Sequence, residues 1–151
     1  MSKKELQEQL KQSMLARDEL KTSVLRMLIS AIGYFEIQKG GAGYHASEED
    51  VLSVIQKEAK QRRDSIEQFK IGGRQDLVDK ETKELELLKA YLPEQMNEEE
   101  IKTLVDKTIA QTNASTMSDM GKVMGILMPK VKGKTDTTLV SQLVKQKLSK
   151  G

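Results

Sequence analysis

The chain has 151 residues, of which 37% are hydrophobic and 32% are charged, and its formal net charge is +2. This composition is typical of a soluble globular protein of one domain or two small ones, and it excludes a disordered chain. The absence of cysteine excludes thiol nucleophiles, thiolate metal sites and disulfides, and it fits a reducing compartment. Because no apolar run of about eighteen residues and no signal-peptide pattern is present, we expect a cytoplasmic protein without a membrane segment.

Apolar residues recur with a period near 3.6 along the chain, whereas alternating β-branched runs are absent and aromatic residues make up 3%. The sequence therefore predicts an all-α fold. Capping patterns at Ser2-x-x-Glu5, Ser47-x-x-Asp50 and Asn97-x-x-Glu100 start the first, third and fifth helices, and glycine pairs at 40–41 and 72–73 end the second and third. We expect an N-terminal bundle of about four helices, at residues 2–17, 18–40 and 47–71 and between Gly73 and Pro93.

Pro93 ends the fourth helix because it has no amide donor and pushes Leu92 out of helical geometry. We place a domain boundary here, which gives an N-terminal helical subdomain at 1–92 and a C-terminal three-helix module at 93–151. Short helices are marginal alone and must pack on one another. The expected helices of the module begin at Asn97, lie around 117–128 and lie near 136–148, with a loop at 129–135.

The most informative stretch of the chain is the segment 120–134, MGKVMGILMPKVKGK, in which lysines follow an apolar helical pattern. Residues 113–151 carry seven lysines against two acidic residues, whereas residues 1–92 carry sixteen basic and sixteen acidic groups. A polyanion should therefore prefer the C-terminal third. Glycines in this stretch would let the backbone of a partner approach. The cations expected to bind are Lys122, Lys130, Lys132 and Lys134.

Several segments together resemble the YqeY-like (GatB/YqeY) proteins: ELLKAYLPEQ at 86–95, the acidic helix start at 98–100, the stretch 120–134 and the apolar pattern at 139–148. The resemblance covers essentially the whole chain. It implies an all-α protein with an N-terminal helical bundle and a C-terminal three-helix module. That module is similar to the tail of the B subunit of the tRNA-dependent amidotransferase, which there contacts tRNA, so the resemblance implies a connection with tRNA.

After Gly133 the chain departs from the family pattern. It has Thr135-Asp136-Thr137 where a small residue, Asp and Gly are usual. The resemblance therefore does not extend to Thr135 and Thr137. The positions that do match imply an interaction edge formed by Gly121, Lys122, Gly125, Lys132, Gly133 and Lys134.

Catalytic and metal-binding residues are not expected in this chain. The lone histidine, His45, lies in an expected loop with no partner at a useful spacing. The segment Lys132-Gly133-Lys134-Thr135 is similar to half of a phosphate-binding P-loop, but Met128 and Pro129 break that pattern. The acidic runs at 48–50 and 98–100 fit first helical turns, where carboxylates stabilise the helix dipole. No cofactor is expected.

A second basic cluster, with two interpretations, lies along the third expected helix. It consists of Lys57, Lys60, Arg62 and Arg63, and it continues to Lys70 and Arg74. Surface pairing of Glu58 with Arg62 and of Arg63 with Glu67, at i,i+4 spacing, is the ordinary explanation. A nucleic-acid stripe is the alternative. No aromatic residue accompanies either basic cluster, so recognition of RNA would depend on its backbone and shape.

A methionine-rich stripe in the sixth expected helix also has two interpretations, core filler and a groove for a partner helix. Its members are Met117, Met120, Met124, Leu127 and Met128. Gly121 and Gly125 each cost this helix about 1 kcal/mol relative to alanine, so a close approach should compensate for them. Either a neighbouring helix or a phosphate backbone could supply it.

The leading functional hypothesis is an accessory RNA-binding protein, non-catalytic alone, whose C-terminal lysines engage a folded RNA such as tRNA. A second hypothesis is a component of a glutamine-dependent carbon-nitrogen ligase. Because the chain has no cysteine, that activity would require an amidotransferase-type or synthetase-type partner subunit. A third hypothesis is a helical protein-interaction adaptor that uses the methionine stripe.

Overall fold

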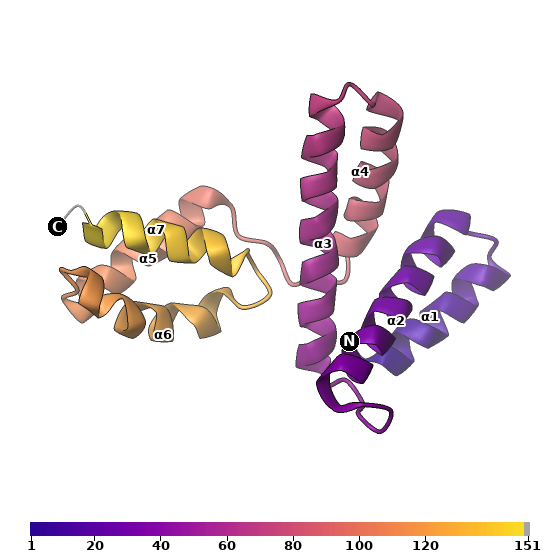
Figure 1. The fold of residues 1–151 in the computed structure, drawn as a ribbon, viewed down its shortest axis with the longest axis horizontal. Helices are drawn as coiled ribbons and strands as arrows, with labels where there is room; N and C mark the ends of the chain where they lie inside the picture. Colours follow the sequence, from indigo (N-terminus) through magenta and orange to yellow (C-terminus); the bar gives the residue numbers. More distant parts are fainter. Residues whose placement is uncertain (150–151) are drawn as a thin grey trace. The chain divides into compact units, whose positions relative to one another are not determined.

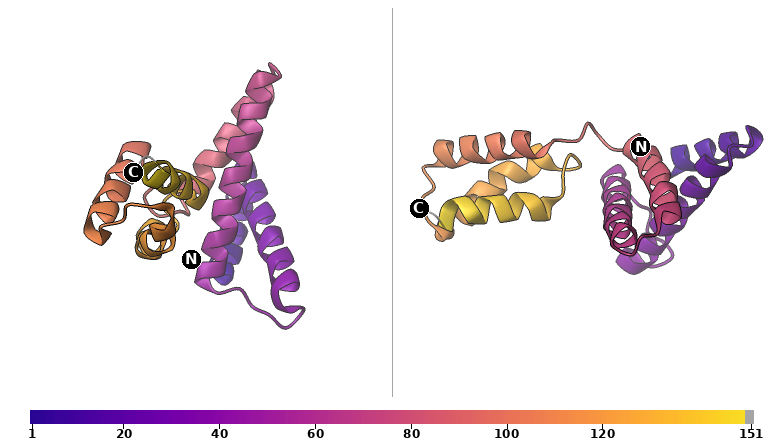
Figure 2. Two further views of the ribbon diagram at one scale, coloured as in Figure 1. Left: turned by 60° about the vertical axis from the view of Figure 1, so that its left-hand side comes forward. Right: turned by 90° about the horizontal axis from the view of Figure 1, so that it is seen from above.

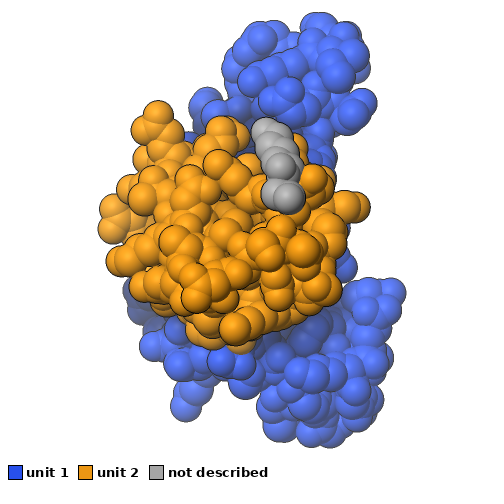
Figure 3. Space-filling view, turned by 90° about the vertical axis from the view of Figure 1, so that its left-hand side faces the viewer, with its two compact units in different colours: residues 1–92 blue, residues 93–151 orange. Residues whose placement is uncertain are grey.

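A computed structural model describes residues 1–149 and confirms the all-α fold (Figure 1). Within these residues the chain forms seven α-helices and one short 3-10 helix, and no strand. The helices fall into two compact units, Met1–Leu92 and Pro93–Gly151 (Figure 3). None of the helices in the described part of the chain has the length and apolar character needed to cross a membrane.

The N-terminal unit consists of two helical hairpins, α1 with α2 and α3 with α4 (Figure 1). Helix α2 also packs on α3 and α4, which joins the hairpins. The four helices meet in one core whose innermost members include Leu6, Leu25, Leu28, Ile55 and Leu88. Burial of each such side chain contributes about 1.5 to 3 kcal/mol. The bounds are α1 Lys3–Leu15, α2 Glu19–Gly40, α3 Glu48–Ile71 and α4 Gln75–Lys89.

The C-terminal unit packs three helices on one another around a separate core (Figure 2). Its bounds are α5 Glu98–Thr112, the 3-10 helix η1 Met117–Asp119, α6 Met120–Val131 and α7 Thr137–Ser149. The core contains Ile101 and Val105 from α5, Val123 and Leu127 from α6 and, from α7, Val140 and Val144. The capping box predicted at Asn97 and Glu100 is present.

The expected loop from Pro129 was wrong, because α6 continues through Pro129 to Val131. The amide of Lys132 donates to the Met128 carbonyl at 3.0 Å, which closes another helical turn after the proline. Pro129 leaves only the Gly125 carbonyl without its usual helical donor, and this glycine is exposed, so water can satisfy it. Burial of Val131 in the core outweighs that loss.

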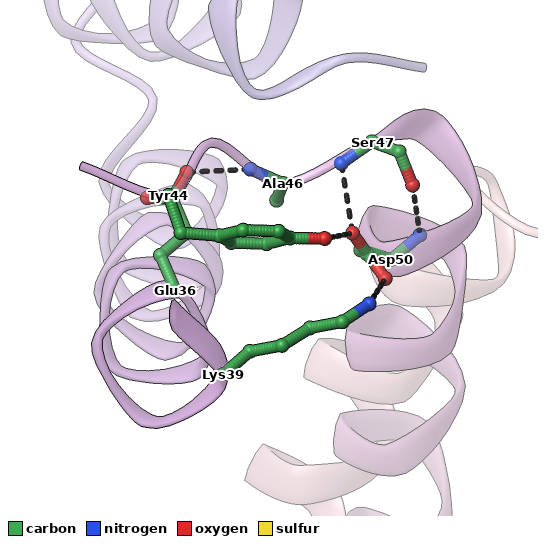
Figure 4. Close-up of polar contacts among 6 residues, drawn as sticks. All are labelled: Glu36, Lys39, Tyr44, Ala46, Ser47 and Asp50. Atoms are coloured by element: carbon green, nitrogen blue, oxygen red, sulfur yellow. Dashed lines mark hydrogen bonds and ion pairs between the residues drawn. The ribbon is translucent and has the colours of Figure 1, made fainter. Parts of the chain in front are cut away.

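The loop between α2 and α3 is fixed by Asp50 in the first turn of α3 (Figure 4). Its carboxylate lies 2.8 Å from Lys39 Nζ, accepts a hydrogen bond from the Tyr44 hydroxyl at 2.5 Å and accepts another from the Ser47 amide at 2.9 Å. Together with Ser47 it forms a capping box, as expected for this helix start. His45 lies exposed in this loop.

A second carboxylate holds the same loop from α2. Glu36 accepts a hydrogen bond from the Ala46 amide at 2.7 Å and pairs with Lys3 Nζ at 2.5 Å. The loop is therefore tied to α1 as well as to α2 and α3. Lys3 and the Ala46 amide hold the pKa of Glu36 below its ordinary value.

Asp50 makes the stability of the N-terminal unit depend on pH. Hydrogen bonds from Lys39, from Tyr44 and from the Ser47 amide hold its pKa far below the ordinary value of 3.8. A depressed pKa in the folded state stabilises the fold above the ordinary pKa and loses that stabilisation as the pH falls. We expect Asp50→Asn to be less stable than the parent at pH 7, and the difference to shrink between roughly pH 5 and pH 2. Urea unfolding followed by circular dichroism across this range would measure it, and parallel curves would contradict the assignment.

Candidate nucleic-acid interface

The C-terminal lysines project from α6 and from the turn that follows it. Val123, Leu127 and Val131 recur every four residues and are fully buried, so they fix which side of α6 faces the core. Lys122 and Lys130 are exposed near the two ends of the helix. At a rise of 1.5 Å per residue, their Cα atoms are about 12 Å apart along the axis.

Lys132 and Gly133 occupy the centre of a type II turn. Lys132 has φ −57° and ψ 123°, Gly133 has φ 78°, and the Lys134 amide donates to the Val131 carbonyl at 2.9 Å. A type II turn requires a positive φ at its third residue, which favours glycine. Gly133 is therefore needed by the turn itself, and a close approach of a partner is not required to explain it.

The same turn is anchored to the segment that precedes α5. The side-chain amide of Gln95 donates to the Gly133 carbonyl at 2.8 Å, and the Met96 backbone amide donates to the Lys134 carbonyl at 2.9 Å. Exposed Lys132 and Lys134 thus project from a hydrogen-bonded backbone. The structure brings three of the four predicted lysines to one end of α6 and leaves Lys122 near the other.

These lysines lie in a region that is poor in carboxylates. Neither α6 nor α7 contains an acidic residue. Lys147 of α7 pairs with Asp106 at 3.1 Å, but within residues 1–149 Lys122, Lys130 and Lys134 form no ion pair. The edge therefore keeps a net positive charge that can attract an anion.

Asp119, just before α6, is occupied by other contacts. The amides of Ser115 and Thr116 donate to its carboxylate at 3.0 and 3.2 Å, and they lower its pKa below the ordinary value. Lys122 lowers this pKa further by its charge. Asp119 serves chiefly to close the turn that leads into α6.

Gly121 and Gly125 lie on an open side of α6. A Cβ atom added at either position would meet no atom within 4 Å, and both residues are exposed. The neighbouring-helix explanation of these glycines is therefore wrong for the described part of this chain. No contact among the described residues compensates for the helix propensity that these two glycines lose.

The methionine stripe divides between core and surface. Leu127 is buried, Met120 and Met124 are half-buried, and Met117 and Met128 are 40% and 36% exposed. Neither interpretation therefore describes the whole stripe. Met124 and Met128 line a groove beside α7, and Met120 packs against the core.

The second basic cluster does not act as one surface, because Arg62 is largely buried. Its guanidinium lies 3.2 Å from Glu84, 3.5 Å from Glu58 and 4.0 Å from Glu81, and it also contacts Met27 of α2. This confirms the pair with Glu58 but corrects the expectation that Arg62 is solvated or binds nucleic acid. Lys57, Lys60 and Arg63 are exposed, and Glu67 pairs with Lys70 at 3.7 Å.

The sequence did not indicate the residues that fix the turn at Lys132 and Gly133. Gln95 follows Pro93 by two positions and bonds to a carbonyl 38 residues away, which no local pattern indicates. The position of glycine within a turn-like segment was the one readable signal, and it was interpreted as room for a partner.

A family model described as Yqey-like protein matches residues 3–148. The relatives found include three yeast proteins named "Altered inheritance of mitochondria protein 41, mitochondrial". The Saccharomyces cerevisiae S288c protein is 39% identical over 83 residues, which cover 55% of this chain and 44% of that protein. The Lachancea thermotolerans protein is 38% identical over 87 residues, with coverage of 58% and 46%. The Vanderwaltozyma polyspora protein is 36% identical over 104 residues, with coverage of 68% and 55%. The chain thus spans about half the length of these relatives.

Alanine substitutions should separate the two kinds of glycine. Gly125→Ala places a methyl group in open space within a helix and should raise the free energy of unfolding by up to about 1 kcal/mol. Gly133→Ala forces a side chain into a positive φ and should lower it by about 1 to 2 kcal/mol. Urea unfolding of both variants, followed by circular dichroism, would measure these changes. A stabilised Gly133→Ala protein would contradict the assigned turn.

Alanine substitutions at the adjacent arginines of α3 should have very different effects on stability. Arg62→Ala leaves buried Glu84 without its partner and should destabilise the N-terminal unit by about 3 kcal/mol. Arg63→Ala changes an exposed side chain and should alter the stability by less than about 0.5 kcal/mol. Thermal unfolding of the two variants under identical conditions is the measurement. Equal effects would show that Arg62 does not stabilise the packing of α3 against α4.

Proposed function

The chain belongs to the YqeY-like family, and from that premise we propose that it is an accessory RNA-binding protein whose C-terminal unit engages a folded RNA. It is non-catalytic alone, and tRNA is the RNA we favour. The preference for tRNA depends on the resemblance of this unit to the tail of the amidotransferase B subunit. The geometry of the unit supports binding through phosphates.

One observation carries the proposal: exposed lysines gather at the end of α6, and two of them, Lys130 and Lys134, form no ion pair within residues 1–149. Lys130, Lys132 and Lys134 lie within five consecutive residues at the end of α6, and the backbone of their turn is fixed by hydrogen bonds from Gln95 and Met96. A fixed backbone reduces the entropy that these residues lose on binding. Lys122, about 12 Å away along α6, adds a contact further along an RNA backbone.

The surface favours a folded RNA over an unpaired strand. Residues 93–151 contain no aromatic residue, so unstacked bases have no ring on which to stack. Lysines bind phosphates as point charges and do not read base edges in the deep groove of an RNA helix. Recognition would then depend on the shape and the phosphate spacing of the RNA.

Any chemistry on the RNA would come from a partner subunit. The chain has no cysteine to act as a thiol nucleophile, and an amidotransferase-type or synthetase-type subunit would supply the reaction. We place the protein in the cytoplasm, because the absence of cysteine fits a reducing compartment. The names of the yeast relatives make mitochondria the competing location.

Salt dependence of tRNA binding tests the proposal. If all four lysines contact phosphates, the logarithm of the association constant should fall with the logarithm of salt concentration with a slope of roughly −3. A variant with Lys122, Lys130, Lys132 and Lys134 changed to glutamine should lose most of the affinity and show a slope near zero. Filter binding or fluorescence anisotropy with labelled tRNA would measure both quantities.

A matched control variant keeps the net charge equal to that of the test variant. It changes four exposed lysines of the N-terminal unit to glutamine, namely Lys4, Lys11, Lys80 and Lys83. This control should retain the affinity and slope of the parent if the C-terminal edge binds the RNA. Equal losses in the two variants would show that only net charge matters, and no binding by the parent at low salt would refute the proposal.

A further inference from the structure

A groove of about 490 Å³ runs between α6 and α7. Met124 and Met128 line it from α6, and Thr138, Ser141 and Lys145 line it from α7. The α7 residues that line it extend from position 137 to 145, which corresponds to about 12 Å, or roughly two helical turns. The groove therefore combines an apolar wall with a polar wall over a length that suits a short segment of helix.

The groove lies on a different side of α6 from the lysines proposed to bind RNA. Lys122, Ile126 and Lys130 are spaced by four residues and share one flank of the helix. Met128 is two residues from Ile126, so about 200° of rotation separates the two side chains. A ligand in the groove and an RNA on the lysine edge would contact opposite flanks of α6.

The groove is positively charged at the end where Lys145 lies. Lys145 has no ion pair among residues 1–149, and neither α6 nor α7 contains an acidic residue. At the other end of the groove, Asp136 precedes α7 and accepts a hydrogen bond from the Thr138 amide at 2.9 Å. A carboxylate of a ligand would therefore gain at the Lys145 end, and a basic group would be repelled there.

The side chains of the apolar wall select the class of ligand. Methionine is long, unbranched and polarisable, and methionine-lined grooves accept apolar side chains from amphipathic helices. A nucleotide base would need an aromatic or guanidinium surface, and no aromatic residue and no arginine occurs in residues 93–151. The open flank at Gly121 and Gly125 places no side chain in the way of a helix that lies along this side.

We propose that the α6–α7 groove binds an acidic amphipathic helix of a partner protein. Apolar residues of that helix, one turn apart, insert between Met124, Met128 and Ser141, and an acidic residue on its adjacent face pairs with Lys145. This interaction is separate from RNA binding and does not require it.

The test uses the full chain and a displayed library of helical peptides of about 16 residues, roughly four turns, with randomised faces. Peptides selected on the parent chain should carry apolar residues at i and i+4 or i+3 beside Asp or Glu. Met128→Glu should weaken binding of a selected peptide at least about tenfold, because it removes an apolar contact and repels the carboxylates. Lys145→Glu should weaken it similarly.

Ile126→Glu is the matched control for Met128→Glu. Ile126 is 37% exposed and Met128 36%, both lie on α6, and the two variants have the same charge. The control should bind the selected peptide like the parent. Lys107→Glu, which changes an exposed lysine of α5, is the matched control for Lys145→Glu. Circular dichroism would confirm that all four variants keep their helices.

Three outcomes would overturn the inference: selected peptides without acidic residues, equal binding by Met128→Glu and Ile126→Glu, or no enrichment of any peptide. Loss of tRNA binding in Met128→Glu but not in Ile126→Glu would assign the groove to RNA and would also reject it. Failure of the RNA proposal would leave the peptide result unchanged, so the two are tested separately.

Discussion

The hydrogen bonds between the segment before α5 and the turn after α6 are the constraint on which the C-terminal unit depends. Through Gln95 and Met96 they hold residues 133 and 134 in place and so set the direction from which Lys132 and Lys134 emerge. The proposed RNA-binding surface therefore depends on two contacts that contain no charged group.

Local sequence signals predicted the helices well, because each start and stop depends on neighbouring residues. The capping boxes at Ser2, Ser47 and Asn97 formed as expected. The prediction failed at Pro129, where burial of Val131 two residues later kept α6 intact. Local sequence signals report the conformational preference of the backbone. Burial of a core side chain further along the chain can outweigh an unfavourable local preference.

The candidate sites were less predictable, because the sequence does not show which charges face each other. Arg62 and Arg63 are adjacent and chemically identical, yet Arg62 contacts Met27 of α2 and pairs with carboxylates of α3 and α4, whereas Arg63 faces solvent. The same holds for glycine: Gly133 is required by its own backbone angle, and Gly121 and Gly125 by nothing within the described chain. The packing of distant helices separates the two arginines, and the local backbone angle separates Gly133 from the other two glycines.

The distribution of rings along the chain has a practical consequence for optical experiments. All three tyrosines, Tyr34, Tyr44 and Tyr91, lie in the N-terminal unit, and the chain has no tryptophan. Near-ultraviolet absorbance and intrinsic emission therefore report on that unit, through groups such as Tyr91, whose hydroxyl donates to Gln9 at 2.6 Å. The C-terminal unit contains no tyrosine or tryptophan, so a ligand that binds it meets no side chain of that unit whose emission could change. A tryptophan introduced into that unit would provide an emission signal that reports on it.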